Sequence, residues 1–160
     1  MARACACVLA AATLVGCSWA PEEPILDQFF SASRLADRTS LANLTTVTFA
    51  PNQQGIVIAY DITTVTPEQR SPFGTSEKTV VDLSINGGPT HIDVSKYDGD
   101  LLSKDVSISA AVKLPTGQTQ RKNLIVTMQR AVLKADKEIV GNWIITGIRD
   151  AAGAASTPRS

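Results

Sequence analysis

The stretch Val106-Ser107-Ile108-Ser109-Ala110-Ala111-Val112-Lys113-Leu114 decides the fold class of this chain. Its even-numbered residues are apolar, and polar Ser107, Ser109 and Lys113 stand between them. Successive side chains of a β-strand point to opposite faces, so this alternation predicts a strand with one face in a core and one in water. Pro115-Thr116-Gly117 follows and is typical of a hairpin turn, so we expect the next strand to run back antiparallel.

The chain after this turn continues in strands. The next strand places four apolar side chains on one face, which Arg130 interrupts: Leu124, Val126, Met128 and Val132. Residues 139–148 form the last predicted strand, with Trp143 and Ile145 on one face. Before residue 106, we predict strands at 45–49, 55–65, 79–85 and, at an edge, 90–94, with a proline-containing loop at 67–78.

The segment before these strands has a helical pattern. Over residues 24–36, Leu26, Phe29, Phe30 and Ser33 fall on one stripe at three- and four-residue spacing. Pro24 suits the first turn of a helix, where its missing N–H is not needed. A second short turn of helix is expected at 40–43, capped by Thr39. A helix followed by a run of strands predicts an α+β fold, and the alternative is an all-β sandwich with a helical arm.

The amino terminus has the pattern of an export signal. Arg3 precedes an uncharged apolar run, residues 4–15, and small residues follow it. Twelve residues of helix span about 18 Å, whereas the hydrocarbon core of a bilayer is about 30 Å thick. Leu14-Val15-Gly16-Cys17 resembles the lipobox of bacterial lipoproteins. The resemblance implies cleavage before Cys17, acylation of its thiol, and a bacterial envelope protein anchored in a bilayer. Ser18 implies the periplasmic face of the outer membrane.

This reading divides the chain into a signal peptide (1–16), a tether (17–23), one folded domain (24–150) and a disordered tail (151–160). Removing residues 1–16 from the 160 leaves 144, a comfortable single domain. Arg3 leaves with the signal, so the 15 basic side chains fall to 14 against 15 acidic ones, a net charge of −1. That balance argues against a nucleic-acid partner. Cys5 and Cys7 are also removed, so no disulfide is expected.

Replacing Cys17 with alanine tests the lipobox. The diacylglyceryl group attaches through a thioether to the thiol of residue 17, so we expect Cys17→Ala to leave an unprocessed or unlipidated precursor. Labelling of cells with a radioactive fatty acid measures this. Equal label in the variant and the unchanged protein would refute the lipid anchor.

The closing pattern of the domain resembles small NTF2-like (cystatin-like α+β) proteins. It consists of a strand, the Pro115–Gly117 turn, a second long strand and then Trp143-Ile144-Ile145-Thr146-Gly147-Ile148. The resemblance covers about residues 24–149. It implies an amino-terminal helix packed on a curved antiparallel sheet, the NTF2-like cone. The family usually has a longer third helix between early strands, and the matching region here, 67–78, is broken by prolines.

Enzymes with this fold work inside the cone, and we expect any pocket of this chain to lie between the amino-terminal helix and the concave face of the sheet. Phe30, Tyr60 and Trp143 are its expected lining, with Asp61 or Arg130 as its polar group. Tyr60 and Asp61 are adjacent in a strand, so only one of them can face a given cavity. Asp61 buried among apolar neighbours would have a raised pKa and could act as a base. It can equally lie at the surface or pair with a cation, and Arg130 can equally hold its head group in water.

No pattern in the sequence indicates a metal, a cofactor or a catalytic residue. His91 is the only histidine, and Asp93, Asp98 and Asp100 lack the spacing of a calcium loop. A serine-hydrolase Gly-x-Ser-x-Gly motif and a phosphate-binding glycine loop are both missing from the sequence.

Three functions therefore stay open. The first is a non-enzymatic, lipid-anchored module that binds a small apolar ligand or a partner protein of the envelope. The second is a cone-pocket enzyme of isomerase or dehydratase type with Asp61 as base. The third is an envelope assembly or scaffolding lipoprotein that pairs through an exposed sheet edge or face.

Overall fold

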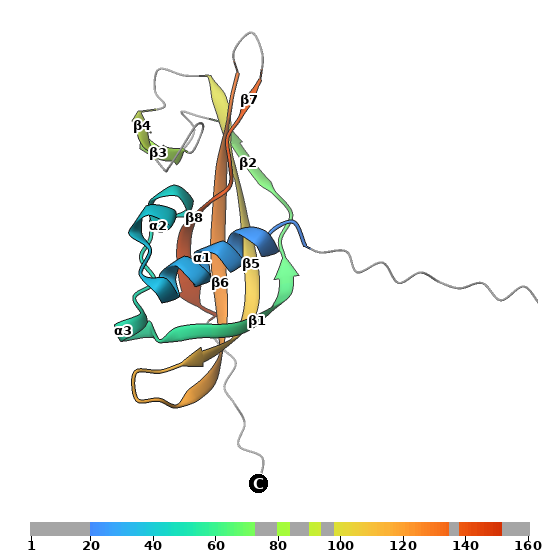
Figure 1. Cartoon of the computed structure of the whole chain (residues 1–160). Helices are drawn as coiled ribbons and strands as arrows, with labels where there is room; N and C mark the ends of the chain where they lie inside the picture. Colours follow the sequence, from blue (N-terminus) through green and yellow to red (C-terminus); the bar gives the residue numbers. More distant parts are fainter. Residues whose placement is uncertain (1–19, 73–79, 84–89, 94–97, 135–137, 152–160) are drawn as a thin grey trace, which may run out of the picture.

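The computed structural model describes residues 20–72, 80–83, 90–93, 98–134 and 138–151 of the chain. The helices within these residues are α1 (Glu23–Leu35), α2 (Arg38–Leu44) and α3 (Pro51–Gln54). The strands are β1 (Ile56–Val65), β2 (Gln69–Pro72), β3 (Val80–Leu83), β4 (Thr90–Asp93), β5 (Gly99–Lys113), β6 (Thr119–Leu133), β7 (Ile139–Val140) and β8 (Ile144–Asp150) (Figure 1). The predicted signal peptide, Cys17 and the tail from residue 152 lie outside the described residues.

A long hairpin of β5 and β6 forms the centre of the sheet (Figure 1). Its register runs without a shift from Gly99↔Leu133 to Lys113↔Thr119. In the turn, the backbone N–H of Gly117 donates to the carbonyl oxygen of Leu114 at 2.9 Å. Gly117 has a φ of +88°, which glycine adopts without a steric penalty. The hairpin predicted from the sequence is confirmed, and its first strand begins seven residues before the predicted start at Val106.

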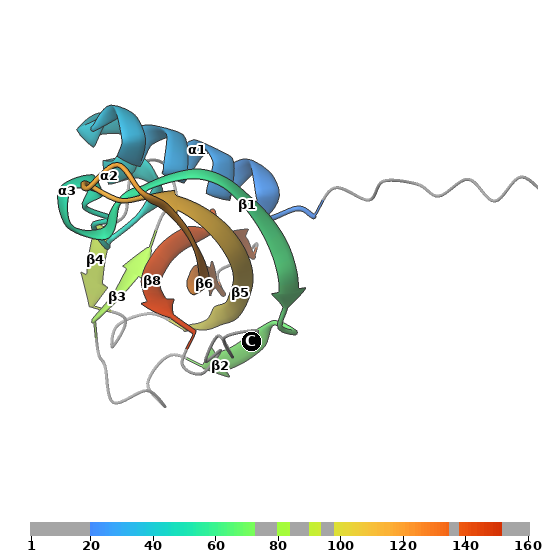
Figure 2. The same ribbon diagram turned by 90° about the horizontal axis from the view of Figure 1, so that it is seen from below.

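The remaining strands of the main sheet lie on either side of this hairpin. The order is β1-β5-β6-β7, β2 also pairs with β5, β8 also pairs with β6, and every one of these pairs is antiparallel. The result is a six-stranded open sheet whose long strands curve strongly (Figure 2). Together with the helices, it confirms the predicted α+β class.

Helix α1 covers one face of the sheet, which we call the inner face; the opposite face is the outer face. The apolar stripe of α1 is buried as predicted, with Leu26 and Phe29 fully inaccessible and Phe30 6% exposed. The sheet side of the core contains Val57, Val106, Ile108, Ala110, Val112, Leu124, Val126, Met128 and Ile145. A helix therefore covers this face of the sheet. In the alternative fold, an all-β sandwich, a second sheet would cover it.

Two bulges change the faces of β1. The sequence predicts strict alternation, with Ile56, Ile58, Tyr60 and Ile62 on one face. The register to β5 shifts between Val57 and Ala59 and again between Ile62 and Thr64. Each shift inserts an extra residue, so Val57 faces the core before the first bulge and Tyr60 and Ile62 pack against it afterwards. Ile58, at the first bulge, is 51% exposed.

The cap of α2 is Asp37 and not Thr39. The Asp37 carboxylate accepts hydrogen bonds from the backbone N–H groups of Thr39 and Ser40, both at 3.1 Å, and from the Ser40 hydroxyl. The hydroxyl of Ser40 and then its backbone N–H lower the pKa of this carboxyl, because both bonds favour the charged form. The helix begins at Arg38, two residues before the predicted start.

The strand predicted at 45–49 does not form. Thr45 makes a single bridge to Ile145, and its hydroxyl bonds the backbone of Val47 and of Ile145. A threonine side chain that binds nearby backbone groups competes with a ladder of strand hydrogen bonds. The segment therefore crosses the end of the sheet as irregular chain, and Phe49 enters the core.

Two further boundaries differ from prediction. The loop expected at 67–78 contains strand β2, which pairs with β5 from Gln69↔Ser103 to Pro72↔Asp100; residues 73–79 lie outside the described part. The last strand is divided into β7 and β8, and between them the backbone N–H of Gly141 donates to Ala131. The strands expected at 79–85 and 90–94 are present as β3 and β4, which pair with each other in a separate two-stranded sheet.

Candidate functional site: a groove between α1 and β1

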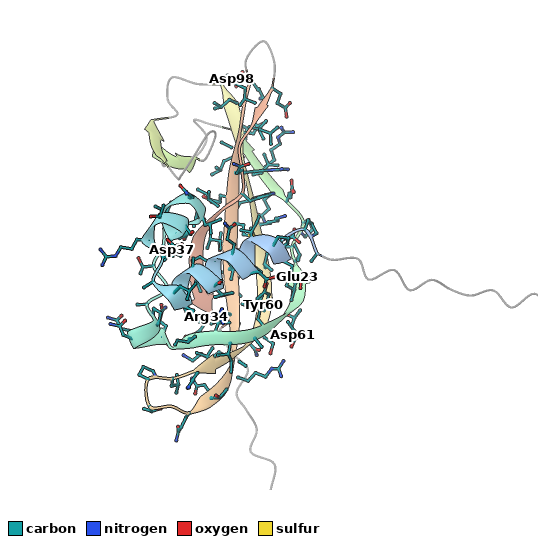
Figure 3. The ribbon with its side chains drawn as sticks, in the orientation of Figure 1. Glu23, Arg34, Asp37, Tyr60, Asp61 and Asp98 are labelled. Carbon is teal, nitrogen blue, oxygen red and sulfur yellow. The ribbon has the colours of Figure 1, made fainter. Side chains whose placement is uncertain are left out.

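An open groove of about 410 Å³ lies between α1 and β1. One wall consists of side chains of the helix: Glu23, Asp27, Phe30, Ser31 and Arg34. The other wall is β1 from Val57 to Tyr60. The helix and the strand run side by side in opposite directions, so Glu23 and Tyr60 mark one end and Arg34 the other (Figures 1 and 3).

The helix wall follows from the sequence of α1. Residues 23, 27, 31 and 34 are three or four positions apart and are polar. Such residues form one stripe along a helix. This stripe lies beside the apolar stripe of Leu26, Phe29 and Phe30, which is buried against the sheet. The helix therefore presents a polar strip along the rim of its own buried face.

Phe30 and Tyr60 are the aromatic residues that line the groove, and Phe30 also packs on rings of the core behind it. The ring centroid of Phe30 is 5.2 Å from that of Phe29, 5.8 Å from that of Phe49 and 5.5 Å from that of Tyr60. The first two pairs meet edge to face, a favourable arrangement for aromatic rings. Side chains thus occupy the space between α1 and the sheet that the sequence assigned to an apolar ligand. What stays open is the rim outside Phe30 and Tyr60.

Tyr60 joins the two walls of the groove. Its hydroxyl donates to Asp27 Oδ1 at 2.7 Å and lies 3.2 Å from the carbonyl oxygen of Glu23. Burial, and then the hydrogen bond to Asp27, raise the pKa of the phenol well above its usual range. Tyr60 is therefore a neutral hydrogen-bond donor that fixes the end of the groove, and it is unsuited to act as a base.

The two ends of the groove carry opposite charges. Glu23 lies at the end marked by Tyr60, and Arg34 is exposed at the other end (Figure 3). Asp27 belongs to the first end, because it bonds the Tyr60 hydroxyl. Within the described residues, neither Glu23 nor Arg34 forms an ion pair with a neighbouring side chain. Both charges are therefore available to a ligand.

The strand wall is an edge of the sheet. Within the part of the chain that the structure describes, β1 pairs with β5 alone, so its other edge has no strand partner. An unpaired edge offers a row of backbone N–H and C=O groups to another strand. Ile58 adds an exposed apolar side chain to this edge at the first bulge.

Asp61 does not line the groove. It lies on the outer face, where Arg121 Nη2 donates to its Oδ2 at 2.5 Å, and the Asp61 side chain is 72% exposed. Arg121 Nε also donates to Ser109 of β5 at 2.8 Å. Asp61 is therefore part of a surface ion pair across three strands, which is one of the alternatives that the sequence left open.

The outer face is polar over much of its area. Arg149 donates to Asp105 Oδ2 at 2.8 Å and to the Thr127 hydroxyl at 3.0 Å, and that hydroxyl donates to Asp105 Oδ1. Partial burial pushes the pKa of Asp105 up, but the hydrogen bonds from Thr127 and Arg149 together bring it below its ordinary value. These outer-face residues form a polar surface, and the exposed large apolar side chains of the described residues lie elsewhere: Leu35, Ile58, Ile139 and Val140.

Arg130 and Trp143 lie in a separate cluster on the inner face, near the start of α1. Lys104 Nζ is 4.2 Å from the centroid of the Trp143 ring and the Arg130 guanidinium carbon is 4.6 Å from it. Lys104 forms an ion pair with Glu22 in which both side chains are at most 7% exposed. Arg130 Nη2 bonds Glu68 at 3.3 Å, and its Nε is buried without a hydrogen-bond partner.

Each charge in this cluster has an opposite partner or an aromatic face. Lys104 and Arg130 are balanced by Glu22 and Glu68, and both cations contact Trp143. The cluster therefore holds the residue before α1 against β5, and both of its cations have an acidic partner, although Arg130 Nε has no hydrogen-bond partner. We treat it as structural.

The sequence located part of the groove and missed the rest. Phe30 and Tyr60 were predicted, whereas Glu23, Asp27 and Arg34 were not, although their spacing next to the apolar stripe was a readable signal. Lys104 was also missed. Lys104 lies two residues before Val106 and so on the same face of β5, but a charged side chain gives no apolar periodicity that would extend the predicted strand to it.

Neither a metal site nor a membrane-spanning helix is found among the described residues. They contain no cluster of three or more metal-binding side chains, and none of their helices is both long and apolar enough to cross a bilayer. His91 lies in β4, and the aspartates near Gly99 make ion pairs with Arg70 and Lys134. Searches of protein-family models, curated proteins and solved structures find no match to this chain.

Proposed function

We propose that this chain is a lipid-anchored protein of the bacterial envelope that binds a segment of a partner protein in the groove between α1 and β1, without catalysis. The proposal rests on an open groove beside a filled core, in which the strand wall, β1, has no second strand partner among the described residues.

The partner segment is favoured over a small apolar ligand because of what fills the inner face. Leu26, Phe29 and Phe30 occupy the space between the helix and the sheet. An apolar ligand needs a concave, mostly apolar pocket that encloses it. The groove instead is open and offers charges, hydroxyl groups and backbone edge groups, which suit a peptide.

The enzyme alternative has less support. A catalytic base on the cone's interior would need Asp61 or a similar acid on the inner face, and Asp61 is on the outer face with Arg121. The acids of the groove, Glu23 and Asp27, lie on an open rim where water is not excluded. We therefore propose a binding module and not an isomerase or dehydratase.

The lipid anchor on Cys17 remains our interpretation of the leader. If it is correct, only residues 17–21 separate the acylated sulfur from Glu22, which Lys104 holds against the sheet. Five residues of extended chain span at most about 18 Å. The groove, whose acidic end begins at Glu23, would then be presented close to the bilayer surface.

We also keep the NTF2-like cone as a hypothesis for the ancestry of the fold. An amino-terminal helix on a strongly curved antiparallel sheet supports it (Figure 2). The main departure lies in the region 67–78, where the family usually has a longer third helix and where this chain has strand β2 (Gln69–Pro72). A strand in place of a covering helix is consistent with a groove at the sheet edge and not an interior pocket.

Photocrosslinking in living cells tests the groove. A photoreactive residue at Ile58, on the groove rim, should form a crosslink to one defined protein, because a segment bound along β1 would touch this side chain. The matched control is the same residue at Asp61, three positions along β1 on the outer face. Crosslinks of equal yield from both positions, or none from Ile58, would contradict the proposal.

A further inference from the structure

The groove has the features that select an extended strand with a defined order of charges. We propose, building on the proposed function, that the bound segment adds to the sheet as a strand antiparallel to β1, with a basic side chain near Glu23 and Asp27 and an acidic side chain near Arg34.

The edge of β1 that has no strand partner among the described residues favours an extended ligand. A peptide that pairs with an exposed edge gains main-chain hydrogen bonds, and its alternate side chains enter neighbouring pockets. In this protein the edge strand forms one wall of the groove and α1 forms the other, so a strand laid along β1 would turn alternate side chains toward the helix. A helical segment would leave the backbone groups of this edge unpaired.

The direction of the bound strand follows from the sheet. All neighbouring pairs of strands in the main sheet are antiparallel, and antiparallel pairing is slightly more stable per residue than parallel pairing. Because α1 runs opposite to β1 (Figure 1), a strand antiparallel to β1 runs in the same direction as α1. Its first residues then lie near Glu23 and its last near Arg34.

The length of the groove sets the spacing of the two charges. From Glu23 to Arg34, α1 rises about 16 Å, and from Asp27 to Arg34 about 10 Å. Residues i and i+4 of a strand share a face and are about 13 Å apart. A basic residue at i therefore reaches the acidic end while an acidic residue at i+4 reaches Arg34. The side chain at i+2 faces Ser31 and Phe30, where a small apolar group fits.

Two defined peptides test this inference with the full acylated protein in detergent micelles. The first, Gly-Ser-Lys-Thr-Val-Thr-Glu-Gly-Ser, has the proposed order of charges, and in the second the lysine and glutamate are exchanged. By fluorescence anisotropy, we expect the first to bind about tenfold more tightly, because its two ion pairs become two like-charge contacts in the second. Equal affinity, or no binding of either peptide, would overturn the proposed order of charges.

A protein variant and a modified peptide separate charge order from strand pairing. The double substitution Glu23→Lys and Arg34→Glu leaves the Tyr60–Asp27 bond in place and should remove or invert the preference. Arg121→Glu, on the outer face, should leave it unchanged. Two N-methylated forms of the first peptide are compared, one with methyl groups on the backbone nitrogens of Lys, Val and Glu, and one with them on the nitrogens of the two Thr residues. Only one of these alternate sets points toward β1, so only one of the two forms should fail to bind. Loss for both sets, or for neither, would contradict pairing with β1.

The outcomes also separate this inference from the proposed function. If Ile58 crosslinks to a defined partner but neither peptide binds, the groove is a binding site and the strand proposal is wrong. If the crosslink at Ile58 joins two copies of this chain, the strand edge pairs with itself, and the proposal of a charged partner peptide is overturned.

Discussion

Replacing Phe29 with alanine is expected to lower the free energy of unfolding by about 3–5 kcal/mol, the range for large aromatic deletions in a packed core. Phe29 is fully inaccessible and packs edge to face on Phe30. The deletion removes buried apolar area and leaves a cavity under α1 that the sheet cannot collapse to fill. Urea unfolding of the non-acylated protein, residues 18–160, measures the loss.

The matched control for Phe29→Ala lies at the end of the same helix. Leu35 is 71% exposed, so Leu35→Ala should change stability by no more than about 0.5 kcal/mol. A loss of less than about 1 kcal/mol in Phe29→Ala would mean that α1 is not packed on the sheet as described. The groove would then lack its helix wall.

The second large effect is expected at the buried ion pair before α1. Glu22 and Lys104 are both nearly inaccessible and bond each other. Removing one partner of such a pair leaves an unpaired buried charge and destabilises by about 3–5 kcal/mol. We therefore expect Glu22→Ala to be strongly destabilising in urea unfolding, although it removes few apolar contacts.

A second substitution in the same background isolates the charge effect. Lys104→Met removes the unpaired ammonium and keeps an apolar stem against Trp143. The double variant Glu22→Ala with Lys104→Met should regain most of the lost stability, since replacing both ions of a buried pair with apolar groups is often neutral. If the double variant is as unstable as Glu22→Ala, the unpaired charge is not the cause.

The fold was predictable where one face of an element is uniformly apolar. The apolar stripe of α1 and the alternating apolar residues from Val106 to Val112 both predict a buried face, and these apolar side chains are buried in the structure. The first half of β5 was missed because its inward positions include Asp100 and Lys104, which are buried as ion pairs. Periodicity reads apolar residues, so it does not detect a strand whose buried side chains are charged.

The faces of β1 could not be read from alternation alone. A bulge adds one residue to a strand and reverses the faces after it, and nothing in Ile56-Val57-Ile58-Ala59 marks the bulge at Ile58. The prediction of a strand at 45–49 was wrong for a different reason. Its β-branched residues favour a strand, but Thr45 binds backbone groups that a ladder would need. Tertiary contacts therefore determined both the faces of β1 and the conformation of residues 45–49.

Of the residues that line the groove, only the aromatic ones, Phe30 and Tyr60, could be predicted from the sequence. Phe30 and Tyr60 meet at the groove, whereas Trp143 and Arg130 meet each other elsewhere, with Lys104. Asp61 points away because neighbours in a strand face opposite sides, which the sequence already indicated for Tyr60 and Asp61. Which of the two faced inward depended on the bulge at Ile58. The local sequence pattern therefore predicted the candidate residues, and the register of β1 decided which of them face the groove.

We expect the protein to be anchored in a bilayer through acylated Cys17, and the intact mass of the native protein tests this anchor. Protein extracted with mild detergent from membranes of cells that make it should begin at Cys17 and carry the additional mass of a diacylglyceryl group with or without a third acyl chain. A mass that corresponds to an amino terminus before residue 17, or to unmodified Cys17, would contradict an anchored groove at the bilayer surface.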